Sequence, residues 1–162
     1  NLSRKIKSGH DKGFRRSGII ASSGARRLRI HGVNVREQID EAHWFLRPAE
    51  DVRSSNFLEL AATEVAIQGL ELDWVGLFWG DDIRRIDDDW EYKSFRGTKW
   101  QNIRAEQDRN YVLNRYRVLL TRAREGLVIW IPRGDSEDPT KNSEFYDGTF
   151  AYLKECGIPV LP

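Results

Sequence analysis

Two short, almost continuously apolar runs limit the folds open to this chain. They cover residues 73–79 (DWVGLFW) and 127–131 (LVIWI), and residues 17–22 (SGIIAS) have a similar character. Runs of this length without alternation are typical of strands covered on both faces, as in parallel sheets. Helical patterns separate these runs. The sequence therefore predicts an α/β domain with a mostly parallel sheet flanked by helices.

The clearest helical pattern covers residues 110–122, where apolar residues recur at helical spacing between Val112 and Leu120. We expect a second helix over residues 144–156 and a helical turn at residues 25–29. The apolar segment 43–46, which is bounded by a proline, predicts a short strand. Strands and helices thus alternate through most of the chain.

Composition and charge exclude several classes of protein. The 162 residues carry a formal net charge of +1, which excludes a uniformly basic nucleic-acid arm. The single cysteine, Cys156, excludes a disulfide framework, and we expect it to be an inert core residue. No apolar run is long enough to cross a bilayer and no signal peptide opens the chain, so we expect a cytoplasmic location and no membrane partner.

A polar insertion is predicted between the central apolar run and the main helix, over about residues 80–109. Five aspartates between residues 81 and 89 predict a solvated acidic loop. Aromatic residues then alternate with polar ones, which predicts a hairpin with Gly97 near its turn. We expect the rings of Trp90, Tyr92 and Trp100 to pack on the core.

Two polar segments lead directly into apolar runs, at residues 62–73 and 114–126. Polar groups at the ends of strands commonly form sites in open α/β sheets. Arg122 and Arg124 lie too close in sequence to share one helical face. Either one faces a ligand while the other braces the loop, or both complement the negative helix end, which stabilises by about 0.3–1 kcal/mol.

The same segments resemble helicase motifs. Thr63 with residues 68–71 (QGLE) resembles motif V of superfamily 1 helicases, and residues 119–124 (LLTRAR) resemble their motif VI. The motif order, and the strand after each, match the second RecA-like domain of those motors. A wider set of segments is similar to a Schlafen-related family of bacterial helicase-like ATPases: residues 52–55, 62–64, 68–74, 95–98 and 144–148.

This resemblance implies a RecA-like domain of the P-loop NTPase type over residues 17–162, with residues 1–16 as a polar lead-in or linker. The implied function is that of a second motor domain in an ATP-dependent helicase or translocase. ATP and Mg²⁺ would be held mainly by an upstream RecA-like domain that carries Walker A and Walker B. The chain itself contains no Gly-x-x-x-x-Gly-Lys-Ser/Thr loop, so we expect it to be inactive alone and to act on DNA or RNA only with that partner domain.

The resemblance also implies roles for individual residues. Arg122 is the expected arginine finger, which stabilises charge during phosphoryl transfer. The expected nucleotide contacts are Gly69 and Glu71, with Arg26 and Arg124 as weaker candidates. Thr63 and Gln68 are expected on the nucleic-acid side, and no metal ligand is expected in the chain.

Two other functions remain open from the sequence. A nucleic-acid-binding module without hydrolytic activity would use the basic N-terminal third for phosphates and Trp90, Tyr92 and Trp100 for stacking. A Mg²⁺-dependent nuclease would use Asp81 or Asp82 together with residues 91–93 (EYK). Because such a short pattern often arises by chance, the nuclease is the weaker alternative.

Overall fold

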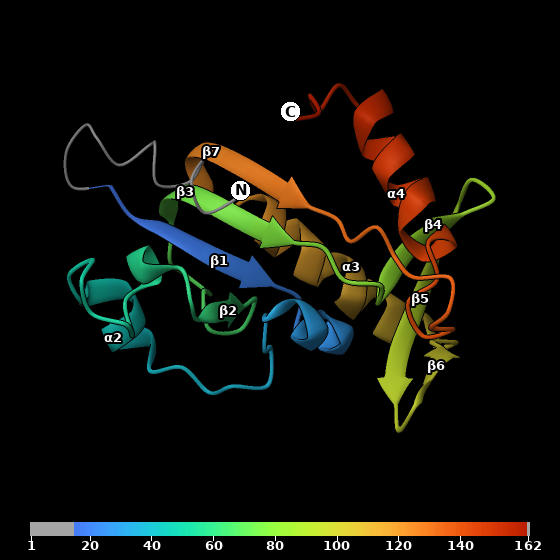
Figure 1. The fold of residues 1–162 in the computed structure, drawn as a ribbon, viewed down its shortest axis with the longest axis horizontal. Coiled ribbons are helices and arrows are strands. Elements are labelled where there is room, and N and C mark those ends of the chain that lie inside the picture. Colours follow the sequence, from blue (N-terminus) through green and yellow to red (C-terminus); the bar gives the residue numbers. More distant parts are fainter. Residues whose placement is uncertain (1–14, 162) are drawn as a thin grey trace.

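A four-stranded parallel sheet forms the centre of the computed structural model, which describes residues 15–161 (Figure 1). Its strands lie in the order β2-β1-β3-β7, and all three pairings are parallel. The strands are β1 (Ser17–Ala21), β2 (Ala61–Thr63), β3 (Leu72–Phe78) and β7 (Ala123–Trp130). The predicted α/β class is confirmed, and the sheet is compatible with a RecA-like domain. The lead-in expected over residues 1–16 lies almost wholly outside the described residues.

Alternation along β1 divides the interior into two cores, one on each face of the sheet. Ile19 and Ala21 pack with Leu28, which comes from the 3-10 helix η2 (Arg26–His31). Ile20 points to the opposite face and joins the core that the helix α3 (Glu106–Leu120) covers. Because successive side chains of a strand point to opposite faces, a run that is apolar throughout must be buried on both sides. β1 meets this condition, with every residue buried.

The helix α3 buries one stripe, formed by Val112, Tyr116 and Leu119, against the sheet. This confirms the helix predicted from the spacing of its apolar residues. Behind the sheet in Figure 1, α3 leads directly into β7. The helix α4 (Glu144–Glu155) also forms where it was predicted. Among the described residues, no helix combines the length and the apolar character that crossing a bilayer requires.

Two local predictions are wrong. Residues 43–46 belong to a helix, α2 (Glu41–Leu46), and not to a strand, because the Asp40 side chain accepts a hydrogen bond from the His43 backbone N–H at 2.9 Å and caps the first turn. Cys156 is exposed at the end of α4 and is not a core residue. The expected helical turn at residues 25–29 is confirmed as η2, and a further short 3-10 helix is η3 (Ser55–Phe57).

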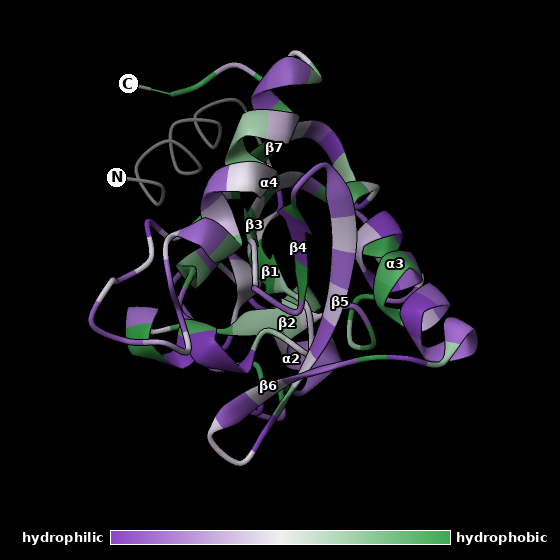
Figure 2. Ribbon diagram, turned by 90° about the vertical axis from the view of Figure 1, so that its right-hand side faces the viewer, coloured by the Kyte–Doolittle hydropathy of each residue, from purple (hydrophilic) through white to green (hydrophobic). Residues whose placement is uncertain are grey.

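The predicted hairpin is part of a separate antiparallel sheet, ordered β4-β5-β6. Its strands are β4 (Ile83–Ile86), β5 (Asp89–Arg96) and β6 (Lys99–Asn102), and Gly97 adopts a φ of +60° in the turn between the last two. Trp90 packs against Trp79 and Tyr152, with ring centroids 6.4 and 5.3 Å apart. Its ring therefore faces the core, as predicted. Figure 2 shows β5 as a largely polar strand in front of the apolar strands of the main sheet.

The helix α4 holds this second sheet in place. Gly148 lies so close to the backbone carbonyl of Arg85 in β4 that a Cβ atom at position 148 would collide with it. The Arg85 backbone N–H donates to Thr149 Oγ1 at 3.2 Å, and Thr149 is fully buried. The second sheet is thus joined to the last helix of the chain as well as to the strands beside it in sequence.

Candidate functional site

The predicted site residues divide between two opposite edges of the parallel sheet. Leu72 and Ala123 begin β3 and β7 and are partners in the register, so the residues before them lie together at the amino edge. Ala21 and Thr63 end β1 and β2 and are also partners, so the residues after them meet at the carboxyl edge. Residues 64–71 run from the carboxyl edge to the amino edge and connect the two.

Arg122 lies at the amino edge, beside the loop that contains Gly69 and Glu71. Its Nε donates to the Val118 carbonyl at 3.1 Å, and its Nη1 lies 3.5 Å from the Leu70 carbonyl. The guanidinium thus complements the carbonyl end of α3 and reaches the loop between β2 and β3. It is half-buried, so part of it remains open to solvent.

Arg124 and Glu71 form a loose ion pair at the same edge. Arg124 Nε lies 3.9 Å from Glu71 Oε2, and the two side chains are 64% and 62% exposed. Gly69 adopts a φ of +82° and has open space around its Cα. The structure thus separates the two arginines, with Arg122 against the helix end and Arg124 beside Glu71. The amino edge brings together Arg122, Arg124, Glu71 and Gly69.

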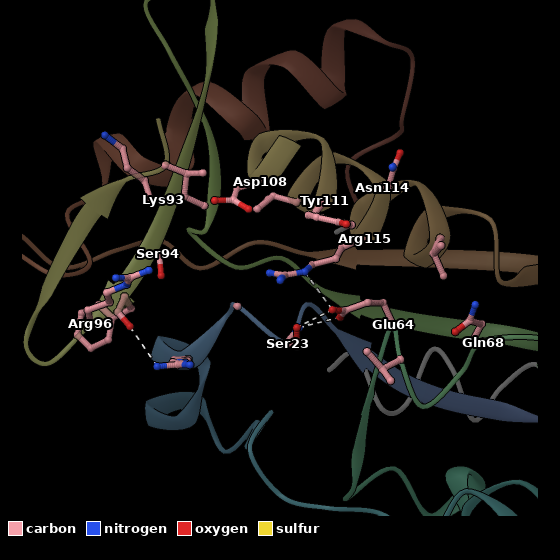
Figure 3. Close-up of a pocket in the computed structure, with 17 residues that line it drawn as sticks. Ser23, Glu64, Gln68, Lys93, Ser94, Arg96, Asp108, Tyr111, Asn114 and Arg115 are labelled. Carbon is pink, nitrogen blue, oxygen red and sulfur yellow. Dashed lines mark hydrogen bonds and ion pairs between the residues drawn. The ribbon is translucent and has the colours of Figure 1, made fainter. Parts of the chain in front are cut away.

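A groove of about 790 Å³ opens at the carboxyl edge (Figure 3). β5 supplies one wall, α3 supplies the other, and the turn after β1 and the segment after β2 form its floor. Arg26 and Gln68 both line this groove. Arg26 was expected to contact the nucleotide, but it lies with Gln68 at the carboxyl edge and not with Glu71 and Arg122.

Thr63 is the last residue of β2 and is half-buried beside the groove floor. Its carbonyl accepts from the Ile67 backbone N–H at 3.1 Å and so closes the first turn of the segment that leads to Gln68. Thr63 and Gln68 therefore belong to one short turn structure. The two residues expected on the nucleic-acid side lie at the same edge of the sheet.

The groove floor contains a carboxylate that the sequence reasoning missed. Glu64 is 9% exposed and accepts two hydrogen bonds from Ser23, from the backbone N–H at 2.8 Å and from Oγ at 2.5 Å. Arg115 Nε lies 3.2 Å from the same carboxylate. A signal was present, because parallel pairing of the first two strands, with Ala21 opposite Thr63, brings the residues that follow each strand to the same edge. Glu64 thereby ties α3 to two strand ends.

A second buried network lies under the groove and corrects the prediction of a fully solvated acidic loop. Asp82 is fully buried and accepts from Ser22 Oγ at 2.5 Å and from Tyr116 Oη at 2.6 Å. Tyr116 Oη in turn accepts from the Gly80 backbone N–H at 3.2 Å. Burial raises the pKa of Asp82 above its usual range. Only the later aspartates of the run, residues 87–89, are exposed.

Asp81 is buried as well, and Tyr146 Oη donates to it at 3.1 Å. Burial, with the neighbouring Asp82 charge as the next cause, raises the pKa of Asp81 to about 7. The buried Arg84 stacks on the Phe145 ring at 3.7 Å, and burial lowers its pKa. These groups are enclosed by the second sheet and α4.

The nuclease arrangement is not supported by this geometry. Asp81 and Asp82 are enclosed, and Glu91 forms an ion pair with Lys93 at 2.9 Å. Within residues 15–161, no group of three or more His, Cys, Asp or Glu side chains is placed to hold a metal ion. The aromatic residues of the module alternative, Trp90, Tyr92 and Trp100, are half-buried, and the Trp100 indole N–H donates to the Thr140 carbonyl at 2.7 Å.

Comparison with known proteins gives one match. No curated protein and no solved structure matched the chain. The model of a protein family described as Schlafen group 3, DNA/RNA helicase domain, matches residues 1–133, which include both edges of the sheet and the whole second sheet. This match covers well over half of the 162 residues. The chain therefore belongs to the Schlafen group 3 DNA/RNA helicase domain family.

Proposed function

We propose that this chain is the second motor domain of an ATP-dependent helicase or translocase. In this function Arg122 is the arginine finger that reaches a nucleotide bound by another RecA-like domain. Glu71 and Gly69 contact the same nucleotide, and the carboxyl edge forms part of the nucleic-acid track. Membership of a helicase-domain family supports the general role.

One observation carries the finer assignment. The Arg122 guanidinium lies 3.5 Å from the Leu70 carbonyl, at the edge of the sheet where Glu71 and Gly69 are also found. A half-buried guanidinium is held in direction by its backbone contacts and still has N–H groups available. Such a cation can stabilise charge that develops on a transferring phosphoryl group.

The amino edge fits one side of a nucleotide. A ribose hydroxyl could donate to the Glu71 carboxylate, which is 62% exposed and lies 3.9 Å from Arg124 Nε. The open space at Gly69 lets backbone come close to a ligand, and its φ of +82° is one that other residues rarely adopt. In this proposal the chain supplies the finger and the ribose contacts, and the partner domain holds the phosphates and Mg²⁺.

The test is Arg122→Ala in a protein that joins this chain to its nucleotide-holding domain. Steady-state ATP turnover should fall by about 10³–10⁵-fold, because loss of an arginine finger removes charge stabilisation in the transition state. Nucleotide affinity, measured by fluorescence with a labelled ATP analogue, should change little. Arg122→Lys should also lose most of the turnover, because Lys lacks the planar fork of donors.

Arg117→Ala is the matched control. Arg117 lies in the last turn of α3, just before Arg122 in the sequence, and is exposed, and its Nη1 donates to Asn114 Oδ1 at 3.1 Å. The substitution removes the same charge without touching the amino edge. Turnover that stays within about threefold of wild type in Arg122→Ala would show that the chain is not the finger-bearing half of a motor.

A further inference from the structure

We propose that the groove between β5 and α3 binds a single strand of DNA or RNA and that the second sheet, β4-β5-β6, contributes to this binding as one wall of the groove. This inference rests on the proposed function, because the strand would be the track of the motor. It assigns a role to the insertion, whose strand β5 forms one wall of the groove that Gln68 also lines. The groove has a volume of about 790 Å³.

The positions of the basic residues favour a phosphate backbone as the ligand. Four cations line the groove, and they come from η2, from both ends of the β5 segment that faces α3, and from α3 itself: Arg26, Lys93, Arg96 and Arg115. Of the acids among residues 15–161, two line it, Glu64 and Asp108. A groove with an excess of positive charge attracts a polyanion at every phosphate.

The internal ion pairs indicate which cation matters most. Glu64 neutralises Arg115 at 3.2 Å, and Glu91 pairs with Lys93 at 2.9 Å. Arg26 Nη1 donates to the Phe95 carbonyl at 3.2 Å, which joins η2 to β5 at one end of the groove. Arg96 is exposed at that same end. We infer that Arg96 makes the largest contribution to phosphate attraction from the second sheet.

An exposed aromatic side chain on the opposite wall favours a single strand over a duplex. Tyr111 projects from α3 into the groove and is 56% exposed (Figure 3). A ring so placed can stack on a base only if the face of that base is free, and bases in a duplex are already stacked on each other. Ser94 and Asn114 add hydrogen-bonding groups on the two walls.

The groove leads toward the proposed motor residues. Figure 3 shows Arg96 at one end, Arg115 and Glu64 in the middle, and Gln68 at the other end. Gln68 belongs to the segment that continues to Leu70, whose carbonyl contacts Arg122. A strand lying along the groove would therefore run from the second sheet to the segment that joins the two edges.

The test uses fluorescence anisotropy with 5′-labelled oligo-dT and oligo-U of 20 nucleotides, measured at several salt concentrations. The variant is Arg96→Ala and its matched control is Lys99→Ala. Arg96 and Lys99 are cross-strand partners in the same hairpin and both are exposed, but only Arg96 lines the groove. Arg96→Ala should weaken binding and reduce the slope of log K against log salt by about 0.7, as expected for one lost phosphate contact on a single strand.

Lys99→Ala should leave the slope within error of wild type. Equal slopes for Arg96→Ala and Lys99→Ala would overturn the proposal, because the two variants differ only in whether the lost charge faces the groove. Tighter binding of a duplex than of a single strand of equal length would overturn it as well.

A second pair of variants tests stacking. Tyr111→Ala should weaken single-strand binding by about 5- to 150-fold, whereas Tyr111→Phe should bind like wild type because it keeps the ring.

The groove and the motor can fail separately. Arg122→Ala should leave single-strand affinity unchanged, since Arg122 lies at the other edge of the sheet. Loss of turnover in Arg122→Ala together with unchanged binding in Arg96→Ala and Tyr111→Ala would reject the groove and retain the motor. Normal turnover in Arg122→Ala with weakened binding in Arg96→Ala would reject the motor and retain the groove.

Discussion

The two edges of the parallel sheet differ in how completely the chain satisfies its own polar groups. At the carboxyl edge, Asp82 is fully buried and Glu64 is 9% exposed, and each accepts short hydrogen bonds from distant elements. At the amino edge, Arg124 and Glu71 are more than 60% exposed and 3.9 Å apart. The carboxyl edge is therefore organised in advance by internal contacts, while the amino edge presents charged groups that a second domain could engage.

The largest effect that tests this contrast is the pH dependence of the free energy of unfolding, which the buried Asp81 at the carboxyl edge should cause. The pKa of Asp81 is raised from 3.8 to about 7, mainly by burial and next by Asp82. Between these values the native protein keeps a proton that the unfolded chain releases, so the free energy of unfolding falls as pH rises through this window. Asp81→Asn removes this dependence.

Between pH 5 and pH 8, the stability of Asp81→Asn relative to wild type should rise by up to about 3 kcal/mol. Urea unfolding midpoints at the two pH values measure this change. Asp89→Asn removes an exposed carboxylate from the same segment and should follow wild type at both pH values. If wild type and Asp81→Asn show the same pH dependence, Asp81 is not enclosed as described.

A somewhat smaller effect is expected from the hydroxyl that links Asp82 to Gly80. Tyr116→Phe removes the donor to Asp82 Oδ1 and the acceptor of the Gly80 N–H, both of which are buried. The free energy of unfolding should fall by about 2 kcal/mol, because buried polar groups without partners are costly. Chemical denaturation measures the loss. Tyr111→Phe, which removes an exposed hydroxyl from the same helix, should change stability by less than about 0.5 kcal/mol.

The smallest effect is expected at the amino edge. Arg124→Ala breaks an exposed ion pair, so it should lower the free energy of unfolding by no more than about 0.5 kcal/mol. The thermal unfolding midpoint would show this directly. A loss above about 1 kcal/mol would mean that the amino edge is as tightly organised as the carboxyl edge, and the contrast between the two would disappear.

Most of the fold was predictable from local patterns. The apolar runs gave β1, β3 and β7, and helical spacing gave α3, because each of these elements buries enough apolar surface to leave a recognisable pattern. α4 was expected before the helix stop at Gly157 and Pro159. α2 was predicted as a strand because a four-residue apolar run has no resolvable period. The Asp40 cap was the signal that would have decided it.

The candidate site was predictable only in part. The motif-like segments identified residues at both edges of the sheet. The sequence alone could not assign each residue to one edge, so Arg26 was grouped with the nucleotide contacts. Parallel register places Arg26 and Arg122 at opposite edges, since Arg26 follows the end of β1 while Arg122 precedes the start of β7. The nucleotide contact expected of Arg26 stays a prediction. Asp81 and Asp82 looked solvated because the groups that enclose them, Tyr116 and Tyr146, lie more than 30 residues away in the sequence.

The close approach of Gly148 to the Arg85 carbonyl has a mechanical consequence. No side chain separates the backbones of α4 and β4 at this point. A displacement of α4 would therefore act directly on β4, whose partner strand β5 forms one wall of the groove. The helix α4 would thus affect the shape of the groove, although no α4 residue lines it.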